Sequence, residues 1–382
     1  MTKKKRIGII TWFYFANPGT AFQAYALQQY INSIPDFESE VINISGNYSF
    51  RNAPILRLYA NEFVSGGKSK FYFPKFTTLC RKIYKLFLGI RAFRFCSFQR
   101  KSIVRFPSRI IKRPLTKEDC SLVNNRYDWV ILGSDQLWNF ELSSIKSIGY
   151  YFLDFVSGPK KGAYSPSLGH GGWPDDQKDR IKGLLADFIF IGVREKQSVD
   201  IVQALANKPI HWSLDPVFLL NKTDWIKIAK KPKHEGDYIF EYCIIKSSEL
   251  CAATEKLASE TGLPIIEHHG DIRKHISSAK RMPHPSADTW LGYLLNAKYV
   301  VTDSFHGSAF CVMMNKDFFT VVTSNGSRIY SMLEVFGLQS RLLADSDGIG
   351  FPASIDWDSV NVLLEDRRKE SQDWLKYSLG IN

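Results

Sequence analysis

The chain has 382 residues, of which 45% are hydrophobic and 14% aromatic, and it carries a formal net charge of +12. This composition excludes a disordered chain and is large enough for about two domains with separate cores. No window of about 18 uncharged apolar residues occurs, and the basic start MTKKKRIGIITWF runs directly into an apolar strand, so we predict a cytosolic protein. The six cysteines form no C-x-x-C pair, and His268, His269 and His275 fit no structural zinc spacing, so we predict neither a disulfide framework nor a metal site.

The chain begins with a β-α-β pattern. KRIGIITWF predicts a strand, NPGTAFQAYALQQYI predicts a turn that opens a helix, and SEVINIS predicts a second strand. This order favours a parallel sheet with helices on its faces.

The excess of positive charge lies in residues 51–113. This segment holds sixteen Lys or Arg residues and one acidic residue, Glu62, whereas the rest of the chain holds 34 basic and 37 acidic residues. The segment is rich in aromatic residues, and its apolar positions between residues 75 and 95 fall on one face of an amphipathic helix. Basic residues interleaved with aromatic ones fit nucleic acid, anionic lipid or a phosphorylated substrate.

Short apolar strands alternate with helical patterns through the rest of the chain. YDWVILG, FIFIGVRE and HWSLDPVFLL predict strands before a charged link, KPKHEGD, and YIFEYCII, KYVVTDS and KDFFTVVT predict strands after it. We therefore predict an α/β fold of two Rossmann-like domains with a central cleft. The first domain covers residues 1–222, with an insertion at about 51–113, and the second covers residues 233–382.

Four loops that follow apolar strands carry polar or glycine-rich residues: ANPGT, GSDQLWN, GVRE and TDSFHG. Ligands of open parallel sheets bind at the carboxyl ends of strands, beside helix N-termini that carry free N–H groups. In the first loop, Asn17 and Thr20 flank Gly19 and can present N–H groups to an anion or a sugar. A helix cap is the simpler interpretation of this loop.

The loop GSDQLWN combines an acid, two amides, a hydroxyl and an indole within six residues. These residues are Ser134, Asp135, Gln136, Trp138 and Asn139. Amide and carboxylate groups match sugar hydroxyls, and a Trp face packs on the apolar side of a sugar ring, so we favour a carbohydrate site. The alternative is an ordinary strand-to-helix turn with Asp135 as the cap and Trp138 in the core.

Arginines in two other loops are candidates for binding an anion. Arg194 follows an apolar strand and can grip a carboxylate or a phosphate with two N–H groups, unless it forms a surface ion pair with Glu195. Arg328 lies at the start of the helical pattern SRIYSMLEVFGL and Arg341 lies past its end, and both are available to anions.

His306, in VVTDSFHGSAF, lies where a buried strand gives way to a helix. A lone histidine is commonly a structural residue, but Gly307 and Ser308 can begin a helix whose N–H groups face an anion. Asp303 is close enough in sequence to orient the imidazole. These features favour a histidine that gives and takes a proton.

Seven motifs occur in a fixed order: NPGTAFQAYALQ, YDWVILGSDQLWN, KKGAYSPSLG, IGVREKQS, SLDPVFLL, VVTDSFHGSAF and SRIYSMLEVFGL. Together they resemble the polysaccharide pyruvyl transferase family over about residues 7 to 343. The resemblance implies a fold like that of the GT-B glycosyltransferases, with an N-terminal acceptor domain and a C-terminal donor-binding domain. It also implies transfer of a pyruvyl group from phosphoenolpyruvate to a sugar, which gives a cyclic pyruvate ketal in a bacterial surface polysaccharide.

The resemblance also implies roles for individual residues. His306 matches the family's motif histidine, an acid/base and a contact of phosphoenolpyruvate, and Arg194 matches the arginine of its vRe loop, an anion ligand. Many members read Arg-Leu-His where this chain reads Ser-Phe-His at residues 304–306. Either Arg328, or less favourably Arg341 or Lys316, supplies the missing charge, or the donor is a different compound. We favour Arg328, because a small, highly charged donor needs several cations.

We therefore predict a ketal-forming transferase that needs no metal and no organic cofactor. The predicted catalytic residues are His306 and Asp135. The predicted donor-binding residues are Arg194, Arg328, Ser304, Gly307 and Ser308. The predicted acceptor-binding residues are Asn17, Thr20, Ser134, Gln136, Trp138 and Asn139.

The predicted partners are phosphoenolpyruvate and a sugar or polyprenyl-diphosphate-linked oligosaccharide, with no nucleic acid. A helix at residues 75–95 would bring a cytoplasmic enzyme to the anionic inner face of the membrane. The alternative is that this helix packs its apolar face on the N-terminal domain. Two other functions stay open: a glycosyltransferase that uses a nucleotide sugar, and a basic nucleic-acid-binding protein, which would leave the cleft loops unexplained.

Overall fold

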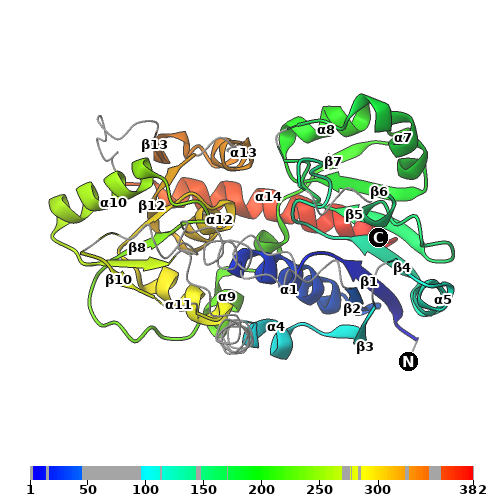
Figure 1. Ribbon diagram of the computed structural model, residues 1–382, viewed down its shortest axis with the longest axis horizontal. Coiled ribbons are helices and arrows are strands. Elements are labelled where there is room, and N and C mark those ends of the chain that lie inside the picture. Colours follow the sequence, from blue (N-terminus) through cyan, green and yellow to red (C-terminus); the bar gives the residue numbers. More distant parts are fainter. Residues whose placement is uncertain are drawn as a thin grey trace, which may run out of the picture.

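The computed structural model arranges the chain in two parallel β-sheets, with a long C-terminal helix that runs past both (Figure 1). It describes residues 3–13, 17–44, 96–111, 114–142, 148–169, 171–268, 276, 278–282, 285–322, 327–343 and 354–381. The predicted helix at 75–95 and most of the basic segment lie outside the described residues. In the described part of the chain, no helix is long and apolar enough to cross a bilayer, and no three or more His, Cys, Asp or Glu side chains form a metal-binding group.

The first sheet has seven parallel strands in the order β3-β2-β1-β4-β5-β6-β7. They are β1 (Lys5–Ile10), β2 (Phe37–Ile44), β3 (Arg105–Ile111), β4 (Trp129–Leu132), β5 (Lys160–Tyr164), β6 (Phe188–Val193) and β7 (Ile210–Trp212). The central strand β4, WVIL, is apolar and buried throughout, as expected for a strand covered by helices on both faces. The strand order reverses between β1 and β4, so the loops after these strands diverge and leave room for a ligand.

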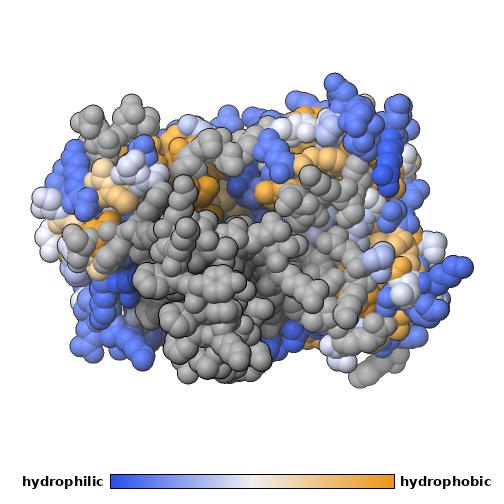
Figure 2. Space-filling model, viewed as in Figure 1, coloured by the Kyte–Doolittle hydropathy of each residue, from blue (hydrophilic) through white to orange (hydrophobic). Residues whose placement is uncertain are grey.

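Helices connect the strands of the first sheet. They are α1 (Pro18–Ser33), α4 (Ser97–Ser102), α5 (Lys117–Asn124), α6 (Ile148–Tyr151), η3 (Asp175–Gln177), α7 (Lys178–Ala186) and α8 (Lys196–Gln203). We call this sheet with its helices the first half. Hydrophilic side chains cover its outer rim over α7 and α8, and they also cover the opposite end of the molecule (Figure 2).

The second sheet has six parallel strands in the order β10-β9-β8-β11-β12-β13, which reverses between β8 and β11. They are β8 (Ile239–Tyr242), β9 (Ile265–His268), β10 (Lys280–Arg281), β11 (Tyr299–Thr302), β12 (Asp317–Val321) and β13 (Leu342–Leu343). Their helices are α10 (Ser248–Thr261), α11 (Ala287–Asn296), α12 (Phe305–Met314), α13 (Ser327–Val335) and η5 (Gln339–Arg341). We call this sheet with its helices the second half. The predicted α/β fold with two Rossmann-like sheets is confirmed.

Capping residues set the ends of the helices that matter for the site. Asn17 caps α1 by accepting a hydrogen bond from the N–H of Gly19, and Pro18 occupies the first helical position. Ser304 caps α12 by accepting from the N–H of Gly307, and Asn315 ends this helix in a left-handed conformation. Helix α12 thus begins three residues after the end of β11, and α1 is the first helix after β1.

A link and a long helix connect the halves. The link contains η4 (Pro216–Leu219) and α9 (Lys222–Ile228), and the helix is α14 (Trp357–Ser378). Val360 and Leu364 of α14 belong to the core of the second half, whereas Leu375 belongs to the core of the first. The division at residues 222 and 233 stays a prediction, and α14 contributes side chains to both cores.

One continuous core joins the two halves. The ring of Phe22, in α1, meets Trp225 of α9 edge-on at 5.1 Å between centroids, and Phe310 of α12 at 5.2 Å. It also contacts Trp290 of α11 at 6.2 Å, and all four rings are buried. Separating the halves would expose this aromatic surface to water, which is unfavourable.

We expect Phe22→Ala to lower the free energy of unfolding by about 3–5 kcal/mol, because it leaves a cavity between four helices. Urea denaturation followed by tryptophan fluorescence and circular dichroism measures the change. Val362→Ala, at a position of α14 that is 62% exposed, is the control and should change stability by less than about 0.5 kcal/mol. Equal effects of the two substitutions would contradict a shared core.

Candidate functional site

The carboxylate of Asp215, just after β7, lies where loops from both sheets meet. Its Oδ2 accepts a hydrogen bond from Ser134 Oγ, after β4, at 3.0 Å and from Arg194 Nη1, after β6, at 2.9 Å. The same oxygen lies 3.6 Å from Nε2 of His306, in the first turn of α12. Its Oδ1 accepts from the N–H of Val217 at 3.1 Å and so caps η4. One buried carboxylate thus contacts groups from the first sheet, the link and the second half.

The charges at this centre stabilise one another. Burial alone would raise the pKa of the Asp215 carboxyl, but the imidazole of His306 beside it and the charge of Arg194 hold that pKa well below its ordinary value. Burial would lower the pKa of Arg194, but the charges of Glu195 and Asp215 raise it above its ordinary value. The centre therefore holds an ionised carboxylate beside an ionised guanidinium.

His306 lies on the start of α1 in the other half. A Cβ atom added at Gly19 would stand 2.2 Å from Cγ of His306, so only glycine lets the imidazole approach this close. The Nε2 atom is buried and has no hydrogen-bond partner among the described residues. This nitrogen therefore keeps its capacity for a hydrogen bond.

Arg194 is only 5% exposed, so the ion pair with Glu195 that was the alternative to anion binding is buried and not at the surface. Its Nε donates to Glu195 Oε1 at 3.2 Å, and its guanidinium lies 4.6 Å from the ring centroid of Phe305. Its Nη2 is buried without a hydrogen-bond partner in the described part of the chain. The Nη2 edge of this guanidinium can thus still donate a hydrogen bond to an anion.

Arg328, in the first turn of α13, lies within the electrostatic reach of the same centre. Burial and the charge of Arg194 lower the pKa of Arg328 to about 10, although nearby Glu195, Asp135 and Asp215 act in the opposite direction. Its Nε has no hydrogen-bond partner among the residues that the structure describes.

The other two cations considered for the missing charge have different surroundings. The guanidinium of Arg341 lies 5.7 Å from the ring centroid of Phe319, and Nζ of Lys316 donates to the carbonyl of Ala297 at 3.1 Å.

The loop after β4 directs its first residues to the start of α1. Asp135 Oδ2 accepts from Thr20 Oγ1 at 2.8 Å, and Asp135 Oδ1 accepts from the N–H of Gln136 at 2.8 Å. Asp135 has a left-handed backbone with φ of 81°, which turns its carboxylate back toward α1. Asn17 is the helix cap of α1, in agreement with the simpler interpretation of its loop.

The predicted sugar-stacking role of Trp138 is wrong. Its ring is fully buried, stacks on Phe152 at 5.2 Å, and donates its indole N–H to the carbonyl of Tyr151 at 3.0 Å. The apolar segment at residues 150–153 packs behind this loop and turns the indole into the core. Asn139 is also buried, where its Nδ2 donates to Gln136 Oε1 at 2.8 Å.

The predicted orientation of His306 by Asp303 is also wrong. Asp303 accepts the N–H groups of Ile244 and Ile245, at 2.6 and 2.8 Å, and so fixes the loop after β8. Asp215 is the carboxylate beside the imidazole, and it is not among the residues predicted for the site. The signal was present in the motif SLDPVFLL, where an acid follows a short strand.

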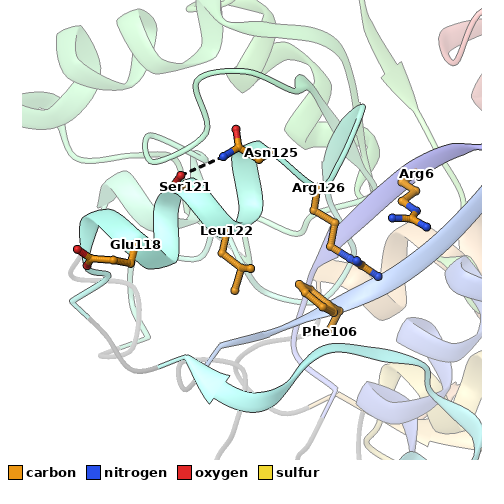
Figure 3. A pocket seen from close by; sticks show the side chains of 7 residues that line it. All are labelled: Arg6, Phe106, Glu118, Ser121, Leu122, Asn125 and Arg126. Atoms are coloured by element: carbon orange, nitrogen blue, oxygen red, sulfur yellow. Dashed lines mark hydrogen bonds between the residues drawn. The ribbon is translucent and has the colours of Figure 1, made fainter.

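A pocket of about 500 Å³ opens elsewhere, at the amino end of β1 (Figure 3). Its lining residues are Arg6, Phe106, Glu118, Ser121, Leu122, Asn125 and Arg126. Its two arginines are already paired, Arg6 with Glu38 and Arg126 with Glu40. The pocket contains none of the predicted site residues and lies away from the carboxyl ends of the strands, so we place the functional site at Asp215.

We expect Asp215→Asn to lower the free energy of unfolding by about 3–5 kcal/mol at neutral pH, because it leaves the buried Arg194 without one of its two partners. Urea denaturation at several pH values measures the effect. A depressed carboxyl pKa contributes stability above the unfolded value of 3.8, and this contribution is lost as the pH falls further, so the difference from wild type should shrink below that pH.

The control for this substitution is Asp373→Asn, which removes the surface partner of Lys369 and should change stability little. Equal losses in the two variants, or a difference that does not depend on pH, would contradict a buried ionic centre at Asp215.

Comparison with known proteins adds a family assignment. The family model described as polysaccharide pyruvyl transferase matches residues 17–325. No curated protein matches the chain.

Solved structures resemble the chain only distantly. A putative UDP-N-acetylglucosamine 2-epimerase from Listeria monocytogenes is 13% identical, with 100% of this chain and 92% of that chain covered and a TM-score of 0.49. The UDP-GlcNAc 2-epimerase of Neisseria meningitidis is 9% identical, with 99% and 94% covered and a TM-score of 0.46. An O-GlcNAc transferase of Thermobaculum terrenum is 12% identical, with 98% and 64% covered and a TM-score of 0.42.

Likenesses of this size establish neither a shared reaction nor a shared substrate. The family match, by contrast, covers most of the chain and includes Asn17, Arg194, Asp215 and His306. The chain therefore belongs to the polysaccharide pyruvyl transferase family.

Proposed function

We propose that the enzyme transfers a pyruvyl group from phosphoenolpyruvate to one sugar of a lipid-linked bacterial surface polysaccharide, forming a ketal and releasing phosphate. One observation carries the proposal: Arg194 and Arg328 are two cations whose charges act on each other, and each keeps a buried N–H atom without a partner among the described residues. Like charges in a low-dielectric site repel, so an anion bound between them is favourable.

The donor would occupy the space between these two guanidiniums and the start of α12. Phosphoenolpyruvate carries a phosphate and a carboxylate, which suits two separate guanidinium groups. Ser308 Oγ, in the first turn of α12, is buried without a partner in the described chain and could donate to the same anion. The N-terminal end of α12, which includes Gly307, favours negative charge. Ser304 contributes its cap to this helix end.

His306 would carry the proton transfers. Protonation of the methylene carbon of phosphoenolpyruvate gives an oxocarbenium-like centre, which a sugar hydroxyl attacks. The proton of that hydroxyl restores the protonated imidazole. A second hydroxyl of the same sugar then displaces phosphate, whose departure takes up the remaining proton, and the ketal closes. The carboxylate of Asp215, 3.6 Å from Nε2, stabilises the imidazolium form between these steps.

The acceptor would bind on the side of the site formed by the first half. Asp135 is the proposed catalytic partner for a sugar hydroxyl, with Gln136, Ser134, Asn17 and Thr20 as further polar contacts. These groups lie around the start of α1, beside the imidazole of His306. We propose a cytoplasmic enzyme that meets its lipid-linked acceptor at the inner face of the membrane, without a metal or organic cofactor.

We expect His306→Ala to reduce turnover by about 10²–10⁴-fold, the usual contribution of a positioned acid/base group. The assay measures phosphate released from phosphoenolpyruvate in the presence of a panel of hexose glycosides with pairs of free hydroxyls. His234→Ala, in the link before β8, is the control and should keep wild-type turnover. Release of a nucleoside diphosphate from a nucleotide sugar, with no phosphate from phosphoenolpyruvate, would instead favour a glycosyltransferase.

We expect Arg328→Ala to weaken phosphoenolpyruvate binding by about 10–100-fold, the loss expected for one charged hydrogen bond. Isothermal titration with phosphoenolpyruvate alone measures this without an acceptor. Arg328→Lys should retain part of the affinity, and Lys316→Ala should retain all of it. A loss of affinity in Lys316→Ala, together with unchanged binding in Arg328→Ala, would show that Lys316 and not Arg328 supplies the second positive charge.

A further inference from the structure

Tyr242 is a buried residue at the site to which neither the motifs nor the proposed chemistry gives a role. It is the last residue of β8, opposite Thr302 of β11 on one side and His268 of β9 on the other. This places it at the reversal point of the second sheet, where ligands of such sheets bind. Its side chain is 2% exposed.

The hydroxyl of Tyr242 reaches from the second half to the cap of α1 in the first. It donates to Asn17 Oδ1 at 3.3 Å, and the same oxygen accepts from the N–H of Gly19 at 2.9 Å. Burial and the charge of Asp303 raise the pKa of Tyr242 far above its ordinary value, so the phenol stays protonated and keeps this hydrogen bond.

Tyr242 contacts two segments that position His306: the backbone at Gly307 and the start of α1. A Cβ atom added at Gly307 would stand 3.1 Å from Cδ1 of Tyr242, so the ring packs against the backbone next to the imidazole. The imidazole in turn packs on Gly19, whose N–H shares the Asn17 oxygen with Tyr242. Tyr242 therefore contacts both the helix that carries His306 and the helix on which its ring rests.

Aromatic neighbours hold the Tyr242 ring in one orientation. It stacks on His268 at 5.7 Å with an angle of 5° between planes, and it meets Trp290 edge-on at 4.9 Å. A ring packed on two sides places its hydroxyl within narrow limits. The hydrogen bond to Asn17 therefore joins the two halves at a fixed position of the Tyr242 ring.

We propose that Tyr242 is a positioning residue, whose hydroxyl sets the distance between His306 and Asp215 by holding the cap of α1 against the second sheet. His306 belongs to the second half, and Asp215 follows β7 of the first. Their separation of 3.6 Å, just beyond hydrogen-bond length, therefore depends on how the halves sit against each other. Displacements of a few tenths of an ångström at such a pair change proton transfer appreciably.

The effect on turnover rests on the proposed function, but the effect on His306 does not. We expect Tyr242→Phe to shift the imidazole resonance of His306 in spectra of histidine-labelled protein, where His306→Ala identifies the signal. Gly19→Ala, which pushes on the same ring, is the positive control. An unchanged His306 resonance in a folded Tyr242→Phe protein would overturn the proposal, whether or not the enzyme uses phosphoenolpyruvate.

Tyr238→Phe is the matched control. Tyr238 lies in the same half, directly before β8, is also buried, and donates its hydroxyl to the carbonyl of Tyr293 at 2.6 Å, within the second half. Its loss should cost stability comparable to the loss in Tyr242→Phe but leave the His306 resonance in place. Equal shifts in the two variants would show that any lost tyrosine hydroxyl disturbs the site, which would also overturn the proposal.

Turnover gives a second, independent measurement. We expect Tyr242→Phe to lower kcat by about tenfold, equivalent to one weakened hydrogen bond, while the affinity for phosphoenolpyruvate stays at the wild-type value. In an Asn17→Ala background the same substitution should have little further effect, because its partner is already absent. If the two substitutions instead multiply their effects on kcat, Tyr242 acts through a group other than Asn17, and the proposal is overturned. Absence of phosphoenolpyruvate turnover in the wild-type enzyme would refute the proposed function and leave the resonance test intact.

Discussion

The buried carboxylate of Asp215 is the constraint on which the rest of the site depends. An ionised carboxylate in the interior is unfavourable unless cations and hydrogen-bond donors surround it. Its donors come from the ends of β4 and β6 and from η4, and the imidazole beside it comes from the second sheet. Both halves must therefore be folded and docked before the charge of Asp215 is fully compensated, which makes the site a product of the whole chain.

The shared core explains how two sheets can hold one site with such short distances. Helix α1 packs on the first sheet and also presents Phe22 to Trp225 and Phe310. Helix α14 contributes to the cores of both halves, and Arg368 on it donates to the carbonyl of Phe218 in the link at 2.7 Å. A large hinge motion would have to break this apolar contact, so we infer that the groups of the candidate site are largely in place before a ligand binds.

The sequence predicted the sheets well because their strands are short, apolar and separated by helical patterns. It also predicted that loops at strand ends of both sheets would form the site, and Arg194 from the first sheet and His306 from the second both lie beside Asp215. It failed where the outcome depends on what packs behind a loop. Trp138 turned into the core because of residues 150–153, and the partner of His306 proved to be Asp215 rather than its sequence neighbour Asp303. The acid of SLDPVFLL is visible in the sequence, but its pairing with His306 is not, because the two residues lie in different halves.

Ser304 and Phe305, the two residues at which this chain departs from the family pattern, each have a local physical role next to His306. Ser304 caps α12 through the N–H of Gly307, and an arginine has no side-chain acceptor to do so. Phe305 offers its ring to the guanidinium of Arg194 at 4.6 Å, a cation–π contact that leucine cannot make. With a cap and an aromatic support at these two positions, the second cation must come from another element. Arg328, at the start of α13 in the second half, is a described cation whose pKa responds to the charges of Arg194 and Asp215.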